Sequence, residues 1–160
     1  MNFTIYADKA EYKKNDTVNY TITIESDKKI TEAKLNLIPG AETFPDAFII
    51  PDAKNVTVSD NSTAVSSFIQ DGIYSFTLSN AAQNEIKLHI PANVQEHTKR
   101  SNTVSVIADI TYADNSHDNT YSQLTLSEDT PLILIIMLFI STIMIASVII
   151  YLLKKLYFSD

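Results

Sequence analysis

The segment DTVNYTITIE, residues 16–25, decides the fold. Apolar residues stand at every second position of this segment, and polar residues fill the positions between them. Successive side chains of a strand point to opposite faces of its sheet, so this alternation predicts a strand with one buried face. The buried face would carry Val18, Tyr20, Ile22 and Ile24.

The same alternation recurs along residues 1–127 and predicts about eight or nine short antiparallel strands. The other predicted strands are Phe3–Ala7, 33–38, Asn55–Ser59, Ala64–Ile69, Ile73–Ser79, 85–90, 102–112 and Tyr121–Ser127. Many short strands separated by polar turns are typical of a β-sandwich. We therefore expect an all-β domain with two packed antiparallel sheets and no helix before Pro131.

Polar segments between these strands predict the turns and loops. The predicted turns include SDKK (26–29), QDG (70–72), SNAAQ (79–83) and YADNSHDN (112–119). The longer polar segment ANVQEHTKRS (92–101) is expected to form a loop.

The C-terminal segment LILIIMLFISTIMIASVIIYLL, residues 132–153, contains no charged residue. As a helix it would be about 33 Å long, and a bilayer core is about 30 Å thick. A core helix of a small soluble domain would be shorter and would show a polar stripe. The segment therefore predicts a transmembrane helix, with the membrane lipid bilayer as its partner.

Charged residues at the two flanks predict how this helix is oriented. Acidic residues precede the segment, whereas Lys154 and Lys155 follow it. Cytoplasmic flanks favour lysine and arginine. We therefore expect residues 1–127 outside, at a cell surface or in a lumen, a linker over 128–131, and a cytoplasmic tail over 154–160.

The start of the sequence shows no basic region followed by an apolar run, which an exported domain would need as a signal peptide. Three explanations stay open: a signal peptide has been removed, the sequence is partial, or the protein is tail-anchored with a cytosolic domain. The charges at the flanks of the helix argue against the third explanation.

Composition excludes several function classes. The net charge of −7 argues against nucleic-acid binding, which depends on neutralising phosphates. The absence of cysteine excludes disulfides and thiol chemistry. Neither a nucleophile elbow nor a glycine-rich phosphate loop occurs in the sequence. We expect no enzyme activity and no cofactor.

Histidine spacing does not predict a metal site. The three histidines are His89, His97 and His117, and no two of them have the spacing of zinc ligands. His89 is expected on the polar face of its strand, and the other two in loops.

The oxygen-rich segment DNSHDNT, residues 114–120, offers the one arrangement that suits Ca²⁺. Asp114, Ser116 and Asp118 alternate as ligands do in some calcium loops, but the glycine and closing glutamate of an EF-hand loop are missing. A hairpin turn explains the same residues, because Asn and Asp tolerate turn geometry. We expect the turn and no metal.

The sequence contains more Asn-x-Ser/Thr sequons than chance alone would give. The candidate glycosylation residues are Asn2, Asn15, Asn19, Asn55 and Asn61. The alternative is a set of unmodified asparagines, many of them in turns.

Small residues on the predicted transmembrane helix suggest a packing face. Thr142 and Ala146 form a small-xxx-small pair, which could pack against a partner helix. Alternatively, the hydroxyl groups bond to carbonyl groups of their own helix.

Four segments of the β-rich part carry a resemblance to a known family. They are NDTVNYTITIES, LNLIPG, DGIYSFTLSNAAQNEIKLHI and SNTVSVIADITY. Across residues 9–114, the chain resembles the Ig-like repeat of prokaryotic cell-surface proteins, of the DUF11 type and its CARDB-like relatives. The resemblance implies an Ig-like β-sandwich that serves as a stalk or adhesion module.

Some members of that family lock the sandwich with a Lys–Asn isopeptide bond. Asn102 matches the family's asparagine, and Lys9, Lys13 and Lys14 lie near the first strand. Asn36 stands where such a bond would need an acid, so we expect Asn102 to be uncrosslinked.

These expectations combine into one hypothesis. The chain would be a membrane-anchored Ig-like β-sandwich with a structural, adhesive or protein-interaction role and no catalysis. Other proteins would be bound through the sandwich or the helix. The alternative is an accessory single-span subunit of a membrane complex, because the chain is similar in plan to the small translocon-associated subunits of the endoplasmic reticulum.

Overall fold

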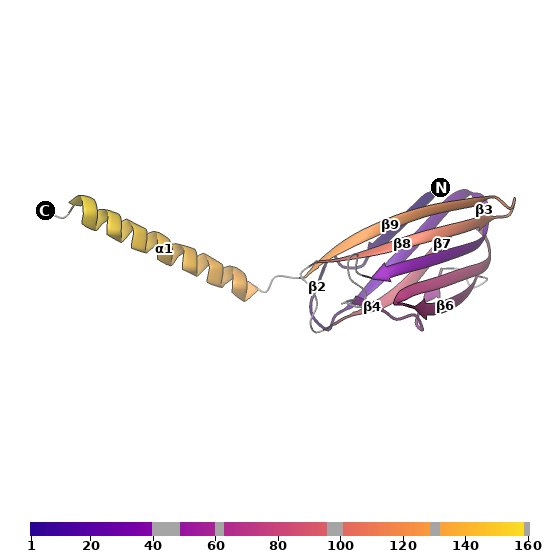
Figure 1. Cartoon of the computed structure of the whole chain (residues 1–160), viewed down its shortest axis with the longest axis horizontal. Helices are drawn as coiled ribbons and strands as arrows, with labels where there is room; N and C mark the ends of the chain where they lie inside the picture. The colour runs from indigo at the N-terminus through magenta and orange to yellow at the C-terminus, as the bar shows by residue number, and fades with distance from the viewer. Residues whose placement is uncertain (40–48, 60–62, 96–100, 129–131, 159–160) are drawn as a thin grey trace. The chain divides into compact units, whose positions relative to one another are not determined.

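A computed structural model of the chain describes residues 1–39, 49–59, 63–95, 101–128 and 132–158. The chain forms two compact units, Met1–Glu128 and Asp129–Asp160. The described strands all belong to the first unit, and the described helix belongs to the second (Figure 1). The elements are β1 (Asn2–Ala7), β2 (Glu11–Tyr12), β3 (Thr17–Pro39), β4 (Ile49–Pro51), β5 (Thr57–Val58), β6 (Ala64–Gln70), β7 (Ile73–Val94), β8 (Ser101–Tyr112), β9 (His117–Glu128) and α1 (Leu132–Phe158).

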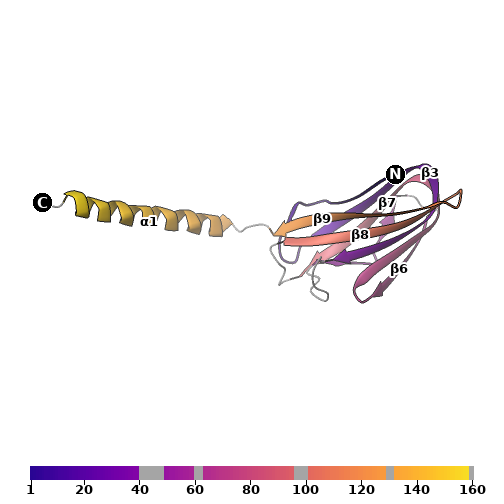
Figure 2. The same ribbon diagram turned by 45° about the horizontal axis from the view of Figure 1, so that its top comes forward.

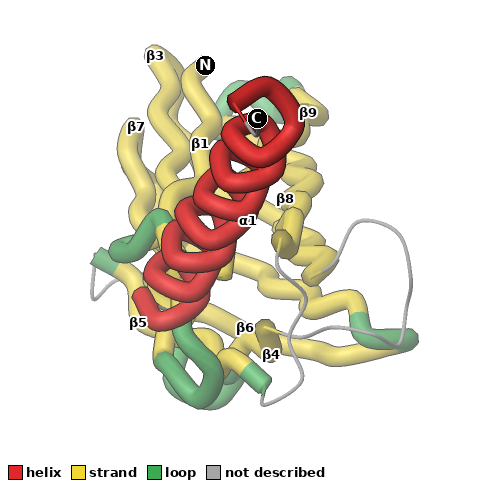
Figure 3. The backbone as a smooth tube through the Cα atoms, turned by 90° about the vertical axis from the view of Figure 1, so that its left-hand side faces the viewer, coloured by secondary structure: helices red, strands yellow, loops and turns green. Residues whose placement is uncertain are grey.

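Two long strands, β3 and β7, are shared by both layers of the sandwich. The first half of β3 pairs with β1 and with the second half of β7. The second half of β3 pairs with β8 and with the first half of β7. One layer therefore holds β1, β3, β7, β4 and β5, and the other holds β9, β8, β3, β7 and β6. Figure 3 shows these strands arranged around a common interior.

The predicted turns SDKK and SNAAQ are wrong, because β3 and β7 remain strands through them. The pairing instead shifts register there: β3 advances from Glu25 to Ile30 while β7 moves only from Glu85 to Gln83. Extra residues on one strand bend and twist the pair, as in a β-bulge. Both strands can therefore pass from one layer to the other while staying hydrogen-bonded.

Alternate residues of both layers form one apolar core. Val18, Tyr20, Ile22 and Ile24 of the opening segment are all buried, as the alternation predicts. The second half of β3 adds Ile30, Ala33, Leu35 and Leu37 to the same core. Burying one such aliphatic side chain contributes about 1.5–3 kcal/mol, so the period-two pattern supplies the main force that closes the sandwich.

The Asp71–Gly72 turn joins β6 and β7 as the QDG signal predicts. Both residues have positive φ, 48° and 65°, which is the geometry of a two-residue type I′ hairpin. Asn115, at φ 61°, lies in the predicted turn between β8 and β9. Asparagine tolerates this left-handed region better than most residues.

Other boundaries differ from the sequence-based expectation. The predicted loop 92–101 is wrong at both ends, because β7 continues to Val94 and β8 begins at Ser101, while residues 96–100 lie outside the described residues. The predicted strand Asn55–Ser59 shrinks to β5. The short strands β2 and β4 were not predicted, because two or three residues are too few to show alternation.

The sandwich has two distinct ends (Figure 2). The exit end is where β9 finishes at Glu128, beside Tyr12 of β2. The far end holds Met1 and the turn between β8 and β9, and there the Met1 sulfur lies 3.2 Å from the Tyr112 hydroxyl. The first and last residues of the domain therefore lie at opposite ends.

The helix α1 is apolar and exposed along most of its length. Its segment Leu134–Lys154 is, by length and composition, sufficient to cross a membrane. The helix continues past Leu153, where the predicted span ends, so Lys154 and Lys155 belong to its last turns.

Candidate binding face

A row of side chains crosses the outer surface of the layer β9–β8–β3–β7–β6. The register places Tyr121 opposite Ile107, Ile107 opposite Asn36, Asn36 opposite Ser75, and Ser75 opposite Phe68. We call these five residues the outer row. Neighbouring strands are about 4.8 Å apart, so the row is about 19 Å long.

The outer row is largely exposed although it lies on regular strands. The exposed fractions are 72% for Tyr121, 39% for Ile107 and 60% for Phe68. In its centre, the Ser75 hydroxyl donates a hydrogen bond of 2.7 Å to the Asn36 side-chain oxygen. This bond fixes the polar middle of the row, which has Ile107 and Tyr121 on one side and Phe68 on the other. The row therefore combines apolar contact area with fixed polar atoms, on a rigid support.

The two described rows that flank the outer row differ in charge. The next row toward the far end sets Lys34 opposite Asp109, and Lys34 forms an ion pair of 3.3 Å with Glu32. The next row toward the exit end sets Ser105 opposite Gln123 and carries no charge. The exit-end side of the row is thus the more easily desolvated of the two.

The outer surface of the other layer, which holds β1, β3, β7, β4 and β5, is less exposed to solvent at its centre. Thr21 of β3 is only 5% exposed, because Tyr6 of β1 and His89 of β7 flank it. The Thr21 hydroxyl and His89 Nδ1 lie 3.0 Å apart in a hydrogen bond. His89 thus lies on the polar face, as predicted, and its ring is bonded within the sheet. His117, which was expected in a loop, is instead the first residue of β9, and its ring bonds the Thr111 hydroxyl. His97 lies outside the described residues.

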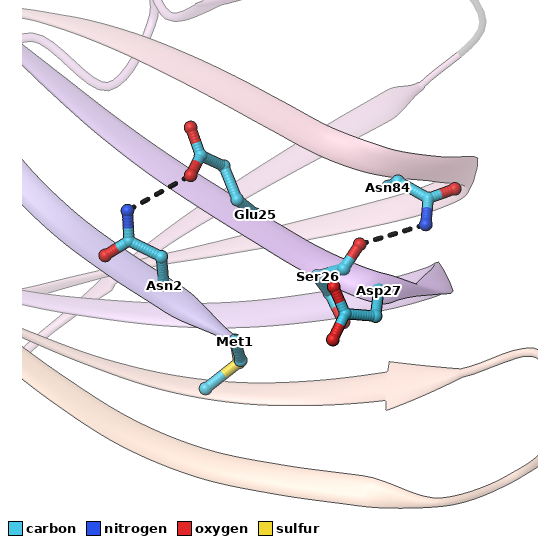
Figure 4. Close-up of a pocket in the computed structure, with 6 residues that line it drawn as sticks. All are labelled: Met1, Asn2, Glu25, Ser26, Asp27 and Asn84. Carbon is cyan, nitrogen blue, oxygen red and sulfur yellow. Dashed lines mark hydrogen bonds between the residues drawn. The ribbon is translucent and has the colours of Figure 1, made fainter.

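A shallow polar depression of about 360 Å³ lies at the far end, lined by Met1, Asn2, Glu25, Ser26, Asp27 and Asn84 (Figure 4). The Asn2 amide donates to the Glu25 carboxylate at 3.1 Å, and the Asn84 amide donates to the Ser26 carbonyl at 2.9 Å. These polar groups satisfy one another, so they do not converge on a ligand. The depression is a weaker candidate than the outer row.

In the turn between β8 and β9, the ammonium group of Lys28 lies among the oxygen atoms that the sequence suggested as calcium ligands. Lys28 Nζ lies 2.8 Å from Asp114 Oδ2 and 2.9 Å from the Ser116 hydroxyl. The hydrogen bond from Lys28 lowers the pKa of Asp114 well below its usual range. Asp118 accepts a hydrogen bond of 2.8 Å from Tyr112. The turn interpretation therefore explains these residues.

The described sequon asparagines lie on the surface. Three of them have side-chain amides that donate to a carboxylate: Asn2 to Glu25, Asn19 to Asp8, and Asn55 to Asp52. Asn15 lies exposed in a turn with φ 64°, and Asn61 is outside the described residues.

The buried side chain of Asn102 contacts a phenol. Its amide donates a hydrogen bond of 2.5 Å to the Tyr12 hydroxyl. Lys9, one of the lysines that the resemblance offered for an isopeptide bond, forms an ion pair of 3.2 Å with Asp16. The lysine and the asparagine thus have other partners.

Hydroxyl groups of α1 bond within the helix. Ser141 and Thr142 each donate to the Leu138 carbonyl at 2.8 Å, and Ser147 donates to the Ile143 carbonyl at 2.8 Å. Thr142 and Ala146 stand one helical turn apart, as their spacing requires. The Thr142 hydroxyl is therefore occupied within its own helix.

Comparisons with known proteins identify the fold. No protein-family model and no curated protein matches the sequence. A non-cellulosomal cohesin from Archaeoglobus fulgidus has a TM-score of 0.62 at 14% identity, over 81% of this chain and 93% of that one. The collagen-binding subdomain of the Enterococcus faecalis surface protein ACE has a TM-score of 0.55 at 9% identity, over 78% and 95%.

The domain is an Ig-like β-sandwich. The major pilin subunit of Bacillus cereus is also similar, with a TM-score of 0.53 at 16% identity, over 81% of this chain and 40% of that one. Identities this low show a shared fold and carry no site residues across.

Sequence reasoning missed the outer row. Alternation indicates that Ile107 and Tyr121 lie outside the core, but it does not indicate which strands are neighbours. A row across five strands exists only through the register, and the register depends on how β3 and β7 pass between the layers. The only signal in the sequence was an apolar or aromatic residue at a position where alternation expects a polar one.

Proposed function

We propose that this chain is a membrane-anchored, non-catalytic surface module whose sandwich binds another protein. Residues 132–153 of α1 would cross the bilayer, residues 1–127 would lie outside, and residues 154–160 would lie in the cytoplasm. The exposed apolar helix and the lysine pair that follows residue 153 support this topology. The same proposal includes that residues 9–114 are related to the DUF11 and CARDB-like repeats.

The outer row carries the binding part of the proposal. Large apolar and aromatic side chains exposed together on a rigid sheet are typical of protein-binding surfaces. Tyrosine and phenylalanine lose little conformational entropy on binding, so Tyr121 and Phe68 suit the role of anchors. A collagen-binding subdomain and a cohesin share the sandwich fold, which supports this use of such a domain.

Cysteine labelling tests the topology. The chain has no cysteine, so single introduced cysteines report one position each. We expect a membrane-impermeant maleimide to label Thr125→Cys on intact cells, and to label Ser159→Cys only after lysis. The reverse pattern would show that the orientation is inverted, and labelling of both positions in soluble protein would exclude the anchor.

Interface substitutions test the binding face. We expect the double variant Ile107→Ser/Tyr121→Ala to lose a partner that the wild-type full chain retains in pull-downs from membranes of its source cell. Tyr6→Ala, which removes an exposed tyrosine from the other layer, is the matched control. Equal recovery of the partner by the double variant would exclude the outer row.

The accessory-subunit alternative predicts a different result in the same pull-down. A subunit held through α1 would bring stoichiometric partners that survive the sandwich substitutions and disappear when Thr142 and Ala146 are both changed to leucine. The intrahelical bond of Thr142 favours the sandwich as the contact, because it leaves that hydroxyl engaged in its own helix.

A further inference from the structure

Within the described part of the chain, strand β6 lies at an edge of the sandwich (Figures 1 and 2). Among the described residues, β6 pairs with β7 alone, through seven register pairs from Ala64↔Ser79 to Gln70↔Ile73. The backbone groups along its other side therefore face away from the sheet. An edge of this kind can accept a further strand.

The composition of β6 lacks the features that normally protect an edge. Its sequence AVSSFIQ contains no charged residue, no proline and no glycine. Six of its seven residues are exposed, including Phe68 at 60% and Ile69 at 54%. Natural edge strands usually carry charges, proline or bulges that prevent pairing. The strand is therefore suited to pairing.

Other described edges are protected. Strands β4 and β5 are only two or three residues long. Strand β9 contains Asp118 and Glu128 and is partly covered by β2, and β1 lies beside β9. Among the described edge strands, β6 is therefore the one that is both long and unprotected.

The sequence of β6 is complementary to itself in the antiparallel direction. With Ser67 opposite Ser67 of a second copy, Val65 stands opposite Ile69, Ser66 opposite Phe68, and Ala64 opposite Gln70. Val65 and Ile69 belong to one face of the strand, because they are four residues apart. Each end of the pairing would then bury one Val–Ile contact, and all seven residues would be paired.

Charge favours the β6 edge over the other surfaces of the chain as the place where two copies meet. The chain carries a net charge of −7, so two copies repel each other over most of their surfaces. In the register centred on Ser67, no carboxylate meets another, since Asp71 falls opposite Thr63. We propose that β6 pairs antiparallel with β6 of a second copy, which joins the two layers into one continuous sheet across a two-fold axis.

This pairing has a geometric consequence that rests on the proposed anchoring. Antiparallel pairing turns one domain end over end relative to the other, so their exit ends point in opposite directions. Two anchored copies whose strands run along the membrane normal would, when paired in this way, lie on facing membranes.

Disulfide trapping of the full chain in detergent tests the pairing without reference to a membrane. Directly opposed strand residues have Cβ atoms about 4.5–5.5 Å apart, close to disulfide geometry. We expect Ser67→Cys to form covalent dimers on mild oxidation. Ser66→Cys and Phe68→Cys should cross-link better when mixed than either does alone. Thr4→Cys, an exposed position on β1, is the control. Cross-linking of Thr4→Cys equal to that of Ser67→Cys would overturn the proposal.

Charge exchange tests the same register with variants that leave the core intact. Ser66→Lys/Phe68→Lys and Ser66→Glu/Phe68→Glu should each lose the dimer seen by sedimentation of the wild-type chain in detergent. Their equimolar mixture should regain it, because lysines then face glutamates. Tyr6→Lys should keep the dimer. A wild-type monomer at every concentration, or a mixture that stays monomeric, would overturn the pairing.

Vesicles test the facing arrangement separately. Wild-type chain reconstituted with its sandwich outward should cluster vesicles, and Ser66→Lys/Phe68→Lys should not. Dimers in detergent without clustering would overturn the facing-membrane arrangement and leave the pairing intact. Failure of the chain to insert into vesicles would instead overturn the proposed anchoring.

Discussion

Asn102 and Tyr12 form a buried hydrogen bond that joins two segments 90 residues apart in the sequence. Tyr12 belongs to β2, which pairs in parallel with the end of β9. Asn102 lies near the start of β8, opposite Leu126 of β9. The bond thus connects the three strands that meet where the chain leaves the sandwich.

Loss of this hydrogen bond should destabilise the domain. Tyr12→Phe removes this one buried hydrogen bond, which costs about 0.5–1.5 kcal/mol. The chain has no tryptophan, so unfolding is best followed by circular dichroism of the strands. Tyr6→Phe, on an exposed tyrosine, should change stability by less than about 0.5 kcal/mol. An equal effect of the two substitutions would contradict the assigned role of Tyr12.

Truncation of a core residue on β3 should have a larger effect. Leu35 is fully buried and stands between Phe76 and Ala108 on the neighbouring strands. Leu35→Ala should lower the free energy of unfolding by about 2–5 kcal/mol, because a cavity opens at a site shared by three strands. Lys34→Ala, whose side chain is exposed, should cost less than about 0.5 kcal/mol in denaturant titrations. A small effect of Leu35→Ala would show that this part of β3 is not in the core.

The Lys28–Asp114 pair should make stability depend on pH in the acid range. The pKa of Asp114 in the folded state lies below the ordinary value of about 3.9, chiefly because Lys28 bonds to it. The pair therefore stabilises the fold above about pH 4, and this contribution is lost as the pH falls through the lowered pKa.

The melting temperature of the wild-type chain should exceed that of Asp114→Asn at neutral pH. The gap should close only below about pH 4, where the unfolded-state carboxyl begins to protonate. Both side chains are exposed, so the effect is small. A difference that disappears between pH 7 and pH 5 would exclude Asp114 as its source.

Reversing the two lysine charges that follow the apolar part of α1 should disturb the orientation of the helix. Lys154→Glu/Lys155→Glu removes the bias that keeps this flank in the cytoplasm, so a larger share of chains should insert with the sandwich inside. Maleimide labelling of Thr125→Cys on intact cells measures that share. Unchanged labelling would indicate that another segment sets the topology.

Period-two alternation sufficed to predict the strands and their buried faces. A strand with one buried face needs apolar residues at every second position, so the burial is visible in the sequence. The alternation failed at residues 26–29 and 79–83, where the polar composition is that of a turn. There the backbone bonds of β3 and β7 are made to each other across a register shift, and local sequence does not reveal a partner some fifty residues away.

The outer row was beyond sequence reasoning for the same reason. Phe68 and Tyr121 stand on opposite edges of a five-stranded layer, and their alignment results from four successive pairings. Each pairing is set by tertiary packing. The Lys28–Asp114 contact likewise joins the bend of β3 to a distant hairpin.

The positions of Met1 and Glu128 at opposite ends determine how the domain would bear a mechanical load. A pull applied at both ends would run along β1 and β9 and not across them. The six register pairs that join β1 to β3, and the long ladder between β8 and β9, would then be sheared together. Bonds that must break at the same time withstand more force than bonds that open one after another, so the sandwich should resist such a pull along its strands.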